Sequence, residues 1–284
     1  MSRILEKEDL APKIVKLVLD APEISRRHQP GQFIILRPDE TSERVPMSVS
    51  HVFPDRGAIA TVIQEVGLTS AKLCAMNAGD EVADLVGPLG RPTHIEKFGT
   101  AVCVGGGAGI PPLHLIAKRL QETGNCLISI LGGRDRRYVL MEEEMRACSD
   151  EVILCTDDGS YGKKGFVTVA LEELIASGRR LDYVLAIGPP IMMKAVADVT
   201  RPHKITTYAS LNTIMIDGTG MCGACRVSVG GETKFVCVDG PEFDAHQVDF
   251  GEMLKRLQMY RKQEVLSYER YQHRRAAQAV GTPQ

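Results

Sequence analysis

The hydrophobic rhythm of the chain changes near residue 98, and this change constrains the fold more than any single motif. Before it, apolar and polar residues alternate over short runs separated by turn signals, which is typical of antiparallel strands. Examples are residues 13–19, 32–36 and 58–64. After it, apolar runs alternate with stretches of helical period. The apolar runs are 101–104, 126–131, 152–155 and 183–187, and the helical stretches are 113–120, 141–148 and 169–177. The order predicts a β + α/β chain, with an antiparallel β-barrel followed by a doubly wound layer around a parallel sheet.

A third, smaller module follows Tyr208. A glycine- and cysteine-rich loop leads into a hairpin-like stretch at 226–236, and a charged helix is expected from about Asp249. The last ten or so residues have the composition of a frayed tail. We therefore expect four segments: a barrel at 1–97, an α/β domain at 98–208, a cysteine module at 209–250, and a C-terminal helix and tail at 251–284.

The composition argues against two classes of binding partner, nucleic acids and membranes. The chain has 34 Lys and Arg residues against 36 Asp and Glu residues, and only 5% aromatic residues. It therefore lacks the basic field and the stacking side chains that nucleic-acid binding uses. The N-terminal stretch carries charges throughout, and no later window offers about 18 uncharged apolar residues. We expect a cytoplasmic protein that binds neither nucleic acid nor a membrane.

The most specific motif is Asp217-Gly-Thr-Gly-Met-Cys222-Gly-Ala-Cys225, with Cys237 after the expected hairpin. Plant-type [2Fe–2S] loops space their ligands as C-x4-C-x2-C with a fourth cysteine further on. Here Asp217 stands at the first position, and a carboxylate can ligate iron while changing the potential of the cluster. The alternatives are a zinc site that adds Asp217 or His246, a redox dithiol, and buried structural cysteines. The spacing favours a [2Fe–2S] cluster on Asp217, Cys222, Cys225 and Cys237.

A glycine-rich segment at 104–112 lies between an apolar run and a helical stretch. Such a loop lets a diphosphate approach backbone N–H groups at a helix N-terminus, although the pattern departs from the Rossmann fingerprint. Two further loops, at 156–162 and 187–193, also begin where an apolar run ends. The candidate NAD(P)-binding residues are Gly105, Gly106, Gly107, Gly109, Pro111, Arg134, Asp157, Gly159, Gly188, Pro189 and Met192. The alternatives are ordinary glycine turns and a methionine pair in the core.

Three arginines, Arg134, Arg136 and Arg137, follow the apolar run that ends near residue 131. They could clamp a ribose 2′-phosphate, which would favour NADP over NAD, or form a solvated basic loop. The preference between the two nucleotides stays open.

Two segments of the expected barrel could hold a flavin. An arginine can pair with a diphosphate, and hydroxyl and amide groups at a helix start can hold a ring or a phosphate. The candidate FAD-binding residues are Arg44, Pro46, Met47, Ser48, Gly67, Thr69 and Ser70. The alternatives are a turn before a strand and a helix cap at Thr69.

The order of these pieces resembles the ferredoxin–NADP+ reductase superfamily, and the cysteine module resembles the branch that contains the dihydroorotate dehydrogenase B electron-transfer subunit. Over residues 1–250 the chain resembles more closely still the small (alpha) subunits of NADH-dependent reduced ferredoxin:NADP+ oxidoreductase, also known as sulfide dehydrogenase subunits. The stretches 210–226 and 236–244 carry this match.

The resemblance implies FAD in the barrel, NAD(H) or NADP(H) at the glycine-rich loop, and a [2Fe–2S] cluster on one Asp and three Cys. It implies ferredoxin–NAD(P)+ oxidoreductase activity in a heterodimer. The partner would be a larger FAD and [4Fe–4S] subunit similar to the small subunit of glutamate synthase, which bifurcates electrons and reaches ferredoxin. Against the superfamily motif R-x-Y/F-S/T, Arg44 stands one place early and Met47 replaces the aromatic residue. Where plant-type reductases end in an aromatic residue over the flavin, this chain continues into the cysteine module.

The partner interface could comprise residues 236–244 and an apolar stripe of Met253, Leu254, Leu257 and Tyr260, although a stripe packed on the chain's own barrel is the ordinary alternative. Other functions stay in view. A dihydroorotate dehydrogenase subunit should carry four cysteines, which Asp217 contradicts. A hydrogenase gamma-type subunit would use the same chemistry, and a zinc-clipped interaction module would bind no flavin.

Overall fold

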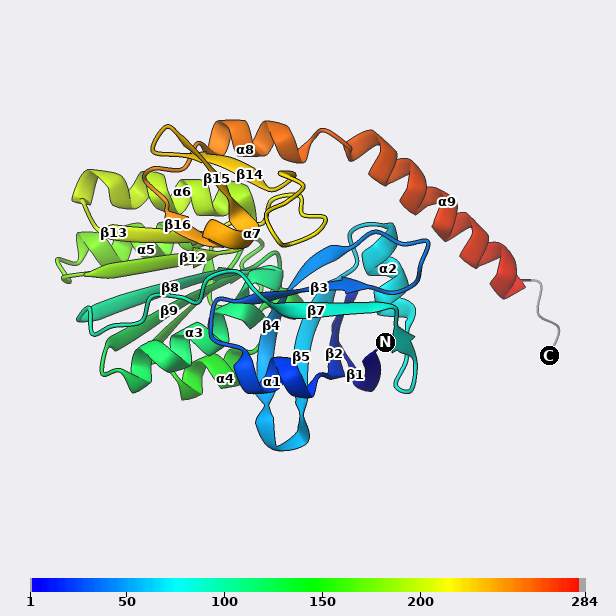
Figure 1. Ribbon diagram of the computed structural model, residues 1–284. Helices are drawn as coiled ribbons and strands as arrows, with labels where there is room; N and C mark the ends of the chain where they lie inside the picture. Colours follow the sequence, from blue (N-terminus) through cyan, green and yellow to red (C-terminus); the bar gives the residue numbers. More distant parts are fainter. Residues whose placement is uncertain (1, 281–284) are drawn as a thin grey trace.

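The computed structural model describes residues 2–280 and begins with an antiparallel barrel, drawn in blue and cyan in Figure 1. Its strands are β1 (Ser2–Ala11), β2 (Ile14–Asp20), β3 (Phe33–Arg37), β4 (Val45–Phe53), β5 (Ala58–Gln64), β6 (Glu81–Val82) and β7 (Asp84–Leu89). Two helices, α1 (Pro22–Arg27) and α2 (Leu68–Ala75), interrupt them. The strand order is β6-β1-β2-β5-β4-β3-β7, so the two edge strands are consecutive in the chain and only Ala83 separates them. The sheet therefore curls until its edges meet, around a core that includes Leu17, Ile34 and Ile59.

The second unit is a parallel sheet covered by helices. It contains β8 (Thr100–Gly106), α3 (Ile110–Glu122), β9 (Cys126–Gly133), α4 (Glu142–Ala147), β10 (Glu151–Thr156), β11 (Lys163–Lys164), α5 (Val167–Ala176), β12 (Tyr183–Ile187), α6 (Pro190–Thr200) and β13 (Thr206–Ser210). The strand order is β11-β10-β9-β8-β12-β13, with helices α3 and α4 on one face and α5 and α6 on the other (Figure 1). The chain order reverses between β8 and β12, which is the switch point where open α/β sheets bind ligands.

The C-terminal elements are β14 (Arg226–Val229), β15 (Glu232–Phe235), α7 (Val236–Asp239), β16 (Glu242–Asp244), α8 (Phe250–Leu257) and α9 (Arg261–Val280). The predicted hairpin forms as β14 and β15. Strand β16 pairs antiparallel with β13, so the cysteine module is joined to the edge of the main sheet. The predicted fold class is confirmed, whereas the segment boundaries at 97, 208 and 250 stay predictions.

The C-terminus differs from the predictions in two respects. A charged helix begins near Asp249 as predicted, but it is interrupted at 258–260 and followed by α9, which continues through Val280. The predicted frayed tail is therefore helical up to Val280, and its remaining part lies outside the described residues. The apolar stripe does not pack on the barrel: its Met253 and Leu257 pack against the α/β core, next to α6 and β14, and its Tyr260 is exposed. Met253 and Leu257 are covered by the chain's own sheet layer because β16 returns the chain to that edge of the sheet.

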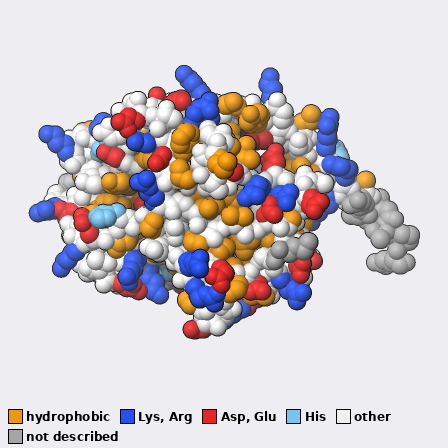
Figure 2. Space-filling model, viewed as in Figure 1, with side chains coloured by type: hydrophobic (Ala, Val, Ile, Leu, Met, Phe, Trp, Pro, Cys, Tyr) orange, Lys and Arg blue, Asp and Glu red, His pale blue; other side chains and the backbone are white. Residues whose placement is uncertain are grey.

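The described surface carries no field of one sign on the face that Figure 2 shows. Blue and red side chains alternate around its periphery, and orange side chains gather across its middle, where the barrel meets the α/β layer. Within residues 2–280, no helix combines the length and the apolar character that crossing a bilayer requires.

Candidate functional site

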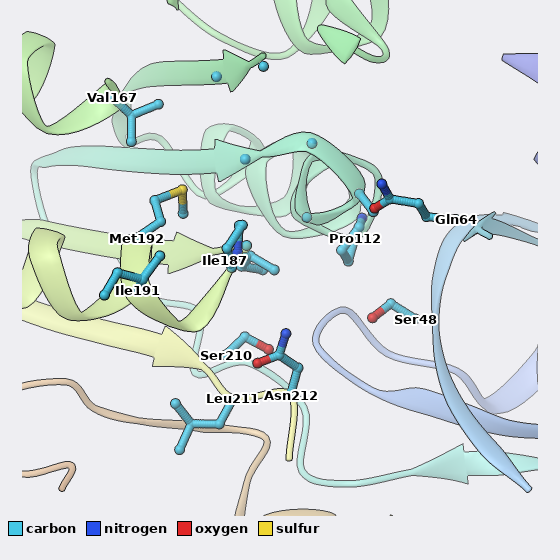
Figure 3. Close-up of a pocket in the computed structure, with 18 of the residues that line it drawn as sticks. Ser48, Gln64, Pro112, Val167, Ile187, Ile191, Met192, Ser210, Leu211 and Asn212 are labelled. Carbon is cyan, nitrogen blue, oxygen red and sulfur yellow. The ribbon is translucent and has the colours of Figure 1, made fainter. Parts of the chain in front are cut away.

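A cavity of about 830 Å³ lies between the barrel and the α/β layer. Its α/β wall is made by loops at the carboxyl ends of the strands, including Gly107, Gly188 and Asn212. Its barrel wall includes Ser48 of β4 and Gln64 at the end of β5 (Figure 3). One site therefore collects loops that lie more than 150 residues apart in the sequence.

The glycine-rich loop after β8 forms part of this wall. Residues Gly107–Gly109 make a short 3-10 turn, and α3 begins at Ile110. A Cβ added to Gly109 would lie 2.2 Å from the Ile187 carbonyl oxygen, so this glycine lets the loop pass directly against β12. Gly107 has a φ of +53° and nothing within 4 Å of an added Cβ, so its backbone is open to the cavity. The N-terminus of α3 and this open backbone make a cradle suited to a diphosphate.

Most of the predicted nucleotide-binding residues line this cavity. They are Gly106, Gly107, Gly109, Arg134, Asp157, Gly188, Pro189 and Met192. Three others do not line it. Gly105 packs against Ile110 and Leu113, Pro111 is buried in the first turn of α3, and Gly159 lies in a turn against Lys164. Their positions point to a structural part in shaping the loops.

The three arginines after β9 have different environments. Arg137 binds Asp135 through two hydrogen bonds of 3.0 and 2.9 Å, and this contact lowers the pKa of Asp135 to about 2. The guanidinium carbon of Arg136 lies 4.9 Å from the centre of the Tyr161 ring. That of Arg134 lies 4.3 Å from the centre of the Tyr138 ring, and Arg134 alone of the three arginines lines the cavity.

The predicted flavin residues divide into two groups. Pro46, Met47 and Ser48 of β4 line the cavity. The second group lies outside the cavity lining and begins with Arg44, which pairs with Asp84 at 3.4 Å. The Arg44 Nε atom is buried and has no hydrogen-bond partner among the described residues.

The remaining three, Gly67, Thr69 and Ser70, lie at the start of α2. The Ser70 hydroxyl accepts hydrogen bonds from the backbone N–H groups of Val66 and Gly67, at 2.9 and 3.0 Å. The Thr69 hydroxyl is buried and has no partner within residues 2–280. A buried donor normally has a partner, so the Arg44 and Thr69 atoms fit a bound flavin nucleotide with an anionic diphosphate.

The cysteine loop brings its predicted ligands together in two pairs. The sulfurs of Cys225 and Cys237 lie 3.2 Å apart in the core that also contains Phe33 of the barrel. Asp217 accepts hydrogen bonds from the N–H groups of Thr219 and Cys222, both at 2.9 Å, and these bonds lower its pKa. Among residues 2–280, no three side chains of His, Cys, Asp or Glu converge as a metal site, and Cys222 is exposed whereas Cys225 and Cys237 are buried.

The donor set nevertheless fits an iron–sulfur cluster. Burial and the adjacent Cys225 thiol raise the pKa of Cys237. Cys225 and Cys237 are therefore stable as thiolates only beside a cation. Gly218, Gly220 and Gly223 all have positive φ, which lets the loop wrap closely over the cysteines. Thiolates are the ligands that such clusters use.

Several cavity residues were not among the predicted site residues. Gln64, Pro112, Ser210, Asn212 and Met215 all line the cavity. Gln64 and Ser210 end strands, and Asn212 and Met215 lie in the loop after β13, so no spacing pattern could reveal these four. Pro112 lies in the first turn of α3 and belongs to the glycine-rich segment 104–112. The rule that ligands bind where parallel strands end could have singled out Ser210 and Asn212.

Comparison with known families identifies two domains. Residues 103–198 match the oxidoreductase NAD-binding domain. Residues 212–249 match the iron-sulfur cluster binding domain of dihydroorotate dehydrogenase B. Together they cover the glycine-rich loop and the cysteine module.

Whole-chain relatives extend this result. A Thermotoga maritima protein named as a dihydroorotate dehydrogenase B (NAD+) electron transfer subunit homolog is 45% identical over 271 residues, 95% of each chain. The electron transfer subunit from Geobacillus thermodenitrificans is 34% identical and covers 86% of this chain and 96% of its own.

Solved structures agree. A chain of an NADH-dependent reduced ferredoxin-NADP oxidoreductase, described in terms of flavin-based electron bifurcation, is 44% identical with a TM-score of 0.90 and covers 95% of this chain and 98% of its own. The ferredoxin reductase of carbazole 1,9a-dioxygenase, 21% identical with a TM-score of 0.60, shares the fold. This chain therefore belongs to the family of the dihydroorotate dehydrogenase B electron transfer subunits and their homologues, and it is an electron-transfer oxidoreductase subunit with a flavin-binding barrel, an NAD-binding domain and an iron–sulfur domain.

Proposed function

We propose that the chain is the small subunit of a ferredoxin–NAD(P)+ oxidoreductase and passes electrons between NAD(H) or NADP(H), FAD and a [2Fe–2S] cluster. The observation that carries the proposal is the cavity that barrel strand β4 shares with the loops after β8, β12 and β13. In this cavity a nicotinamide nucleotide bound by the loops at the strand ends would contact a flavin ring bound on the barrel. Hydride exchange and its division into single electrons are the chemistry that the bound cofactors supply.

On the nucleotide side, the backbone N–H groups at Gly106, Gly107 and Gly109 would hold the diphosphate at the start of α3. Arg134 and Asp157 would contact one half of the dinucleotide, and Gly188, Pro189 and Met192 the other. Met192 also fixes the loops, because its sulfur would lie 2.6 Å from a Cβ added to Gly106.

On the flavin side, β4 presents Pro46, Met47 and Ser48 to the cavity. Arg44 and Thr69 would each offer the flavin nucleotide a buried donor that has no partner among residues 2–280. Ser70 keeps the segment at Gly67 in place through its two backbone hydrogen bonds. The ligands of the cluster would be Asp217, Cys222, Cys225 and Cys237.

The surface around the cysteine loop supports a protein partner. Ile216, Met221 and Val238 are 53%, 88% and 38% exposed and flank three of the proposed ligands. Exposed apolar side chains next to a redox site fit a docking surface for an electron-transfer partner. We propose that the partner is a larger FAD and [4Fe–4S] subunit similar to the small subunit of glutamate synthase, through which ferredoxin is reached and electrons are bifurcated.

Electron transfer to a dihydroorotate dehydrogenase is the second candidate function, because relatives at 34–36% identity carry that name. Asp217 in place of a first cysteine ligand argues against it. The two candidates differ in the protein that should co-purify with the chain.

The proposal is tested on anaerobically purified protein by absorbance, by assays of iron, acid-labile sulfide and released flavin, and by mass spectrometry of the co-purifying subunit. About one flavin, two irons and two sulfides per chain are expected. Addition of NADH or NADPH should bleach the flavin absorbance. A colourless chain that retains zinc, or a dihydroorotate dehydrogenase as the co-purifying subunit, would overturn the proposal.

A further inference from the structure

Five loops along the α/β wall of the cavity follow the order of the strands in the sheet. The order β10-β9-β8-β12-β13 places Asp157, Arg134, Gly107, Gly188 and Asn212 one after another along this wall. The loop with the open backbone and the helix N-terminus stands in the middle of the series. A dinucleotide whose diphosphate binds there must send its two nucleosides in opposite directions, one over β9 and β10 and one toward β12 and β13.

The β13 end of the series lies opposite barrel strand β4, whereas the segment after β9 packs through Leu140 against Ile14 and Val62 of β2 and β5. In Figure 3, Ser210 and Asn212 lie across the cavity from Ser48 of β4, with Pro112 and Gln64 above them. Because the flavin ring is proposed on β4, the reacting nicotinamide must occupy this end. The adenosine half then lies toward Arg134 and Asp157.

Asn212 has a free carboxamide at this end. Its side chain is exposed to the cavity, and it makes no hydrogen bond to another residue within 2–280. A carboxamide offers both donors and an acceptor, so it complements a second carboxamide through two hydrogen bonds. The nicotinamide ring carries such a group.

The backbone on both sides of Asn212 is anchored. The N–H of Leu211 donates to the Pro241 carbonyl at 2.9 Å, and the Thr213 hydroxyl donates to the Cys225 carbonyl at 3.5 Å. Leu211 and Thr213 are buried on either side of it. Asn212 is therefore an exposed amide on a fixed segment, as a positioning residue requires.

We propose that the Asn212 carboxamide binds the carboxamide of the nicotinamide ring and so sets the position of the reacting ring against the flavin. The inference rests on the proposed function. It identifies a positioning residue for the reacting ring at the β13 end of the cavity.

The test is the purified, cofactor-loaded protein with Asn212→Ala. Titration should show binding of NADH, or of NADPH if that nucleotide reduces the flavin, weakened about tenfold, as the loss of one or two hydrogen bonds requires. Binding of ADP-ribose, which lacks the nicotinamide, should not change. The 3-acetylpyridine analogue of the nucleotide lacks the amide N–H₂ group, so the wild-type protein should bind it more weakly than the natural nucleotide, and Asn212→Ala should bind both equally.

Two control variants separate positioning from a structural effect. Asn77→Ala removes an exposed asparagine in a barrel turn and should bind every ligand as the wild type does. Thr213→Val disturbs the anchored segment without removing the cavity amide and should keep the preference for the natural nucleotide. If Asn212→Ala loses ADP-ribose to the same extent as the reduced nucleotide, or if it keeps the preference for the amide, the inference is wrong and the proposed function stands. If the wild type binds neither NADH, NADPH nor ADP-ribose, the proposed function itself is wrong.

Discussion

Two of the predicted flavin-binding residues hold a buried donor that has no hydrogen-bond partner among residues 2–280. The donors are the Nε atom of Arg44 and the hydroxyl of Thr69, and they indicate that the barrel binds a ligand there. An unsatisfied buried donor costs on the order of 1–3 kcal/mol, so a folded protein keeps one where a ligand will satisfy it. A neighbouring arginine offers a comparison, because Arg37 shares the ion-pair partner Asp84 with Arg44.

Replacing Arg44 with Ala should weaken FAD retention about tenfold, because a charge-assisted hydrogen bond to a flavin nucleotide is lost. The measurement is the dissociation constant of FAD by fluorescence recovery on dilution. Arg37→Ala is the matched control, since it removes the stronger contact with Asp84, at 2.7 Å, and should leave FAD bound. Equal loss of FAD in both variants would show that Asp84, rather than the flavin, is what Arg44 serves.

The cysteine loop gives a second prediction for single residues. Cys225→Ser should lose iron and acid-labile sulfide while the flavin stays reducible by nucleotide, because a buried thiolate ligand is removed. Asp217→Cys should keep a [2Fe–2S] signal with a lower reduction potential, since a thiolate donates more electron density than a carboxylate. Iron and sulfide assays and a redox titration followed by electron paramagnetic resonance give both results. A cluster that neither substitution alters is not held by these residues.

The residues that the sequence pattern located are those with fixed spacing. The x4 and x2 intervals pick out Asp217, Cys222 and Cys225, and the glycine-rich run picks out Gly107. The sequence patterns did not reveal Asn212, because a single polar residue after a strand belongs to no periodic or spaced motif. Its place in the cavity depends on the order of strands in the sheet, which only the three-dimensional structure shows.

Among the elements, β5 and β12 have the predicted bounds, and the other predicted strands and helices of the α/β layer shift by a few residues. Periodicity works there because each strand or helix buries one face or both. Strand β16 was not predicted, because three residues leave no measurable period. The position of helix α8 could not be predicted either, because it depends on β16. This strand returns the chain to the edge of the main sheet, so α8 packs beside α6 rather than on the barrel.

In the loop between β8 and α3, substitution by Ala should affect Gly109 and Gly107 in different ways. Gly109→Ala should lower the free energy of unfolding by about 3 kcal/mol, because its Cβ would overlap the backbone at Ile187 and Gly188, which cannot move aside. Gly107→Ala should cost only about 1 kcal/mol of backbone strain, but its Cβ enters the cavity and should weaken nucleotide binding. Urea unfolding and nucleotide titration of both variants are the measurements. Equal stability of the two variants would contradict the close approach of the Gly107–Gly109 turn to the end of β12.

At the scale of the whole molecule, the connection between barrel and α/β layer is also bound to the cysteine module. Arg91 donates from its backbone N–H to the Gly240 carbonyl at 2.6 Å and from its Nε to the Val238 carbonyl at 3.0 Å. The Thr93 hydroxyl donates to the Glu242 carboxylate at 2.6 Å. These contacts join residues more than 140 positions apart, so no local pattern in the sequence could predict them. They hold the cysteine loop in a fixed place relative to the flavin barrel.

Glu242 makes this connection sensitive to pH. Burial raises the pKa of its carboxyl group from 4.5 to about 7, although the bond from Thr93 acts in the opposite direction. Below pH 4.5 both the folded and the unfolded chain carry the proton, so the contribution of Glu242 to stability is fully present. Between pH 4.5 and 7 the unfolded chain releases the proton and the folded chain keeps it, so stability is lost as the pH rises. Above pH 7 the loss is complete, at about 3 kcal/mol.

Glu242→Gln should remove this dependence, because the amide stays neutral and its oxygen still accepts from Thr93. The measurement is the urea midpoint of both proteins between pH 4.5 and 8, compared as a difference. The difference is needed because burial lowers the pKa of His51 to about 4 and also lowers the pKa of His114, so these histidines make stability rise over the acidic part of the range. The variant should match the wild type near pH 4.5 and exceed it above pH 7. A difference that stays constant with pH would mean that the Glu242 carboxyl group is ionised throughout and that the contact with Thr93 is an ordinary charged hydrogen bond.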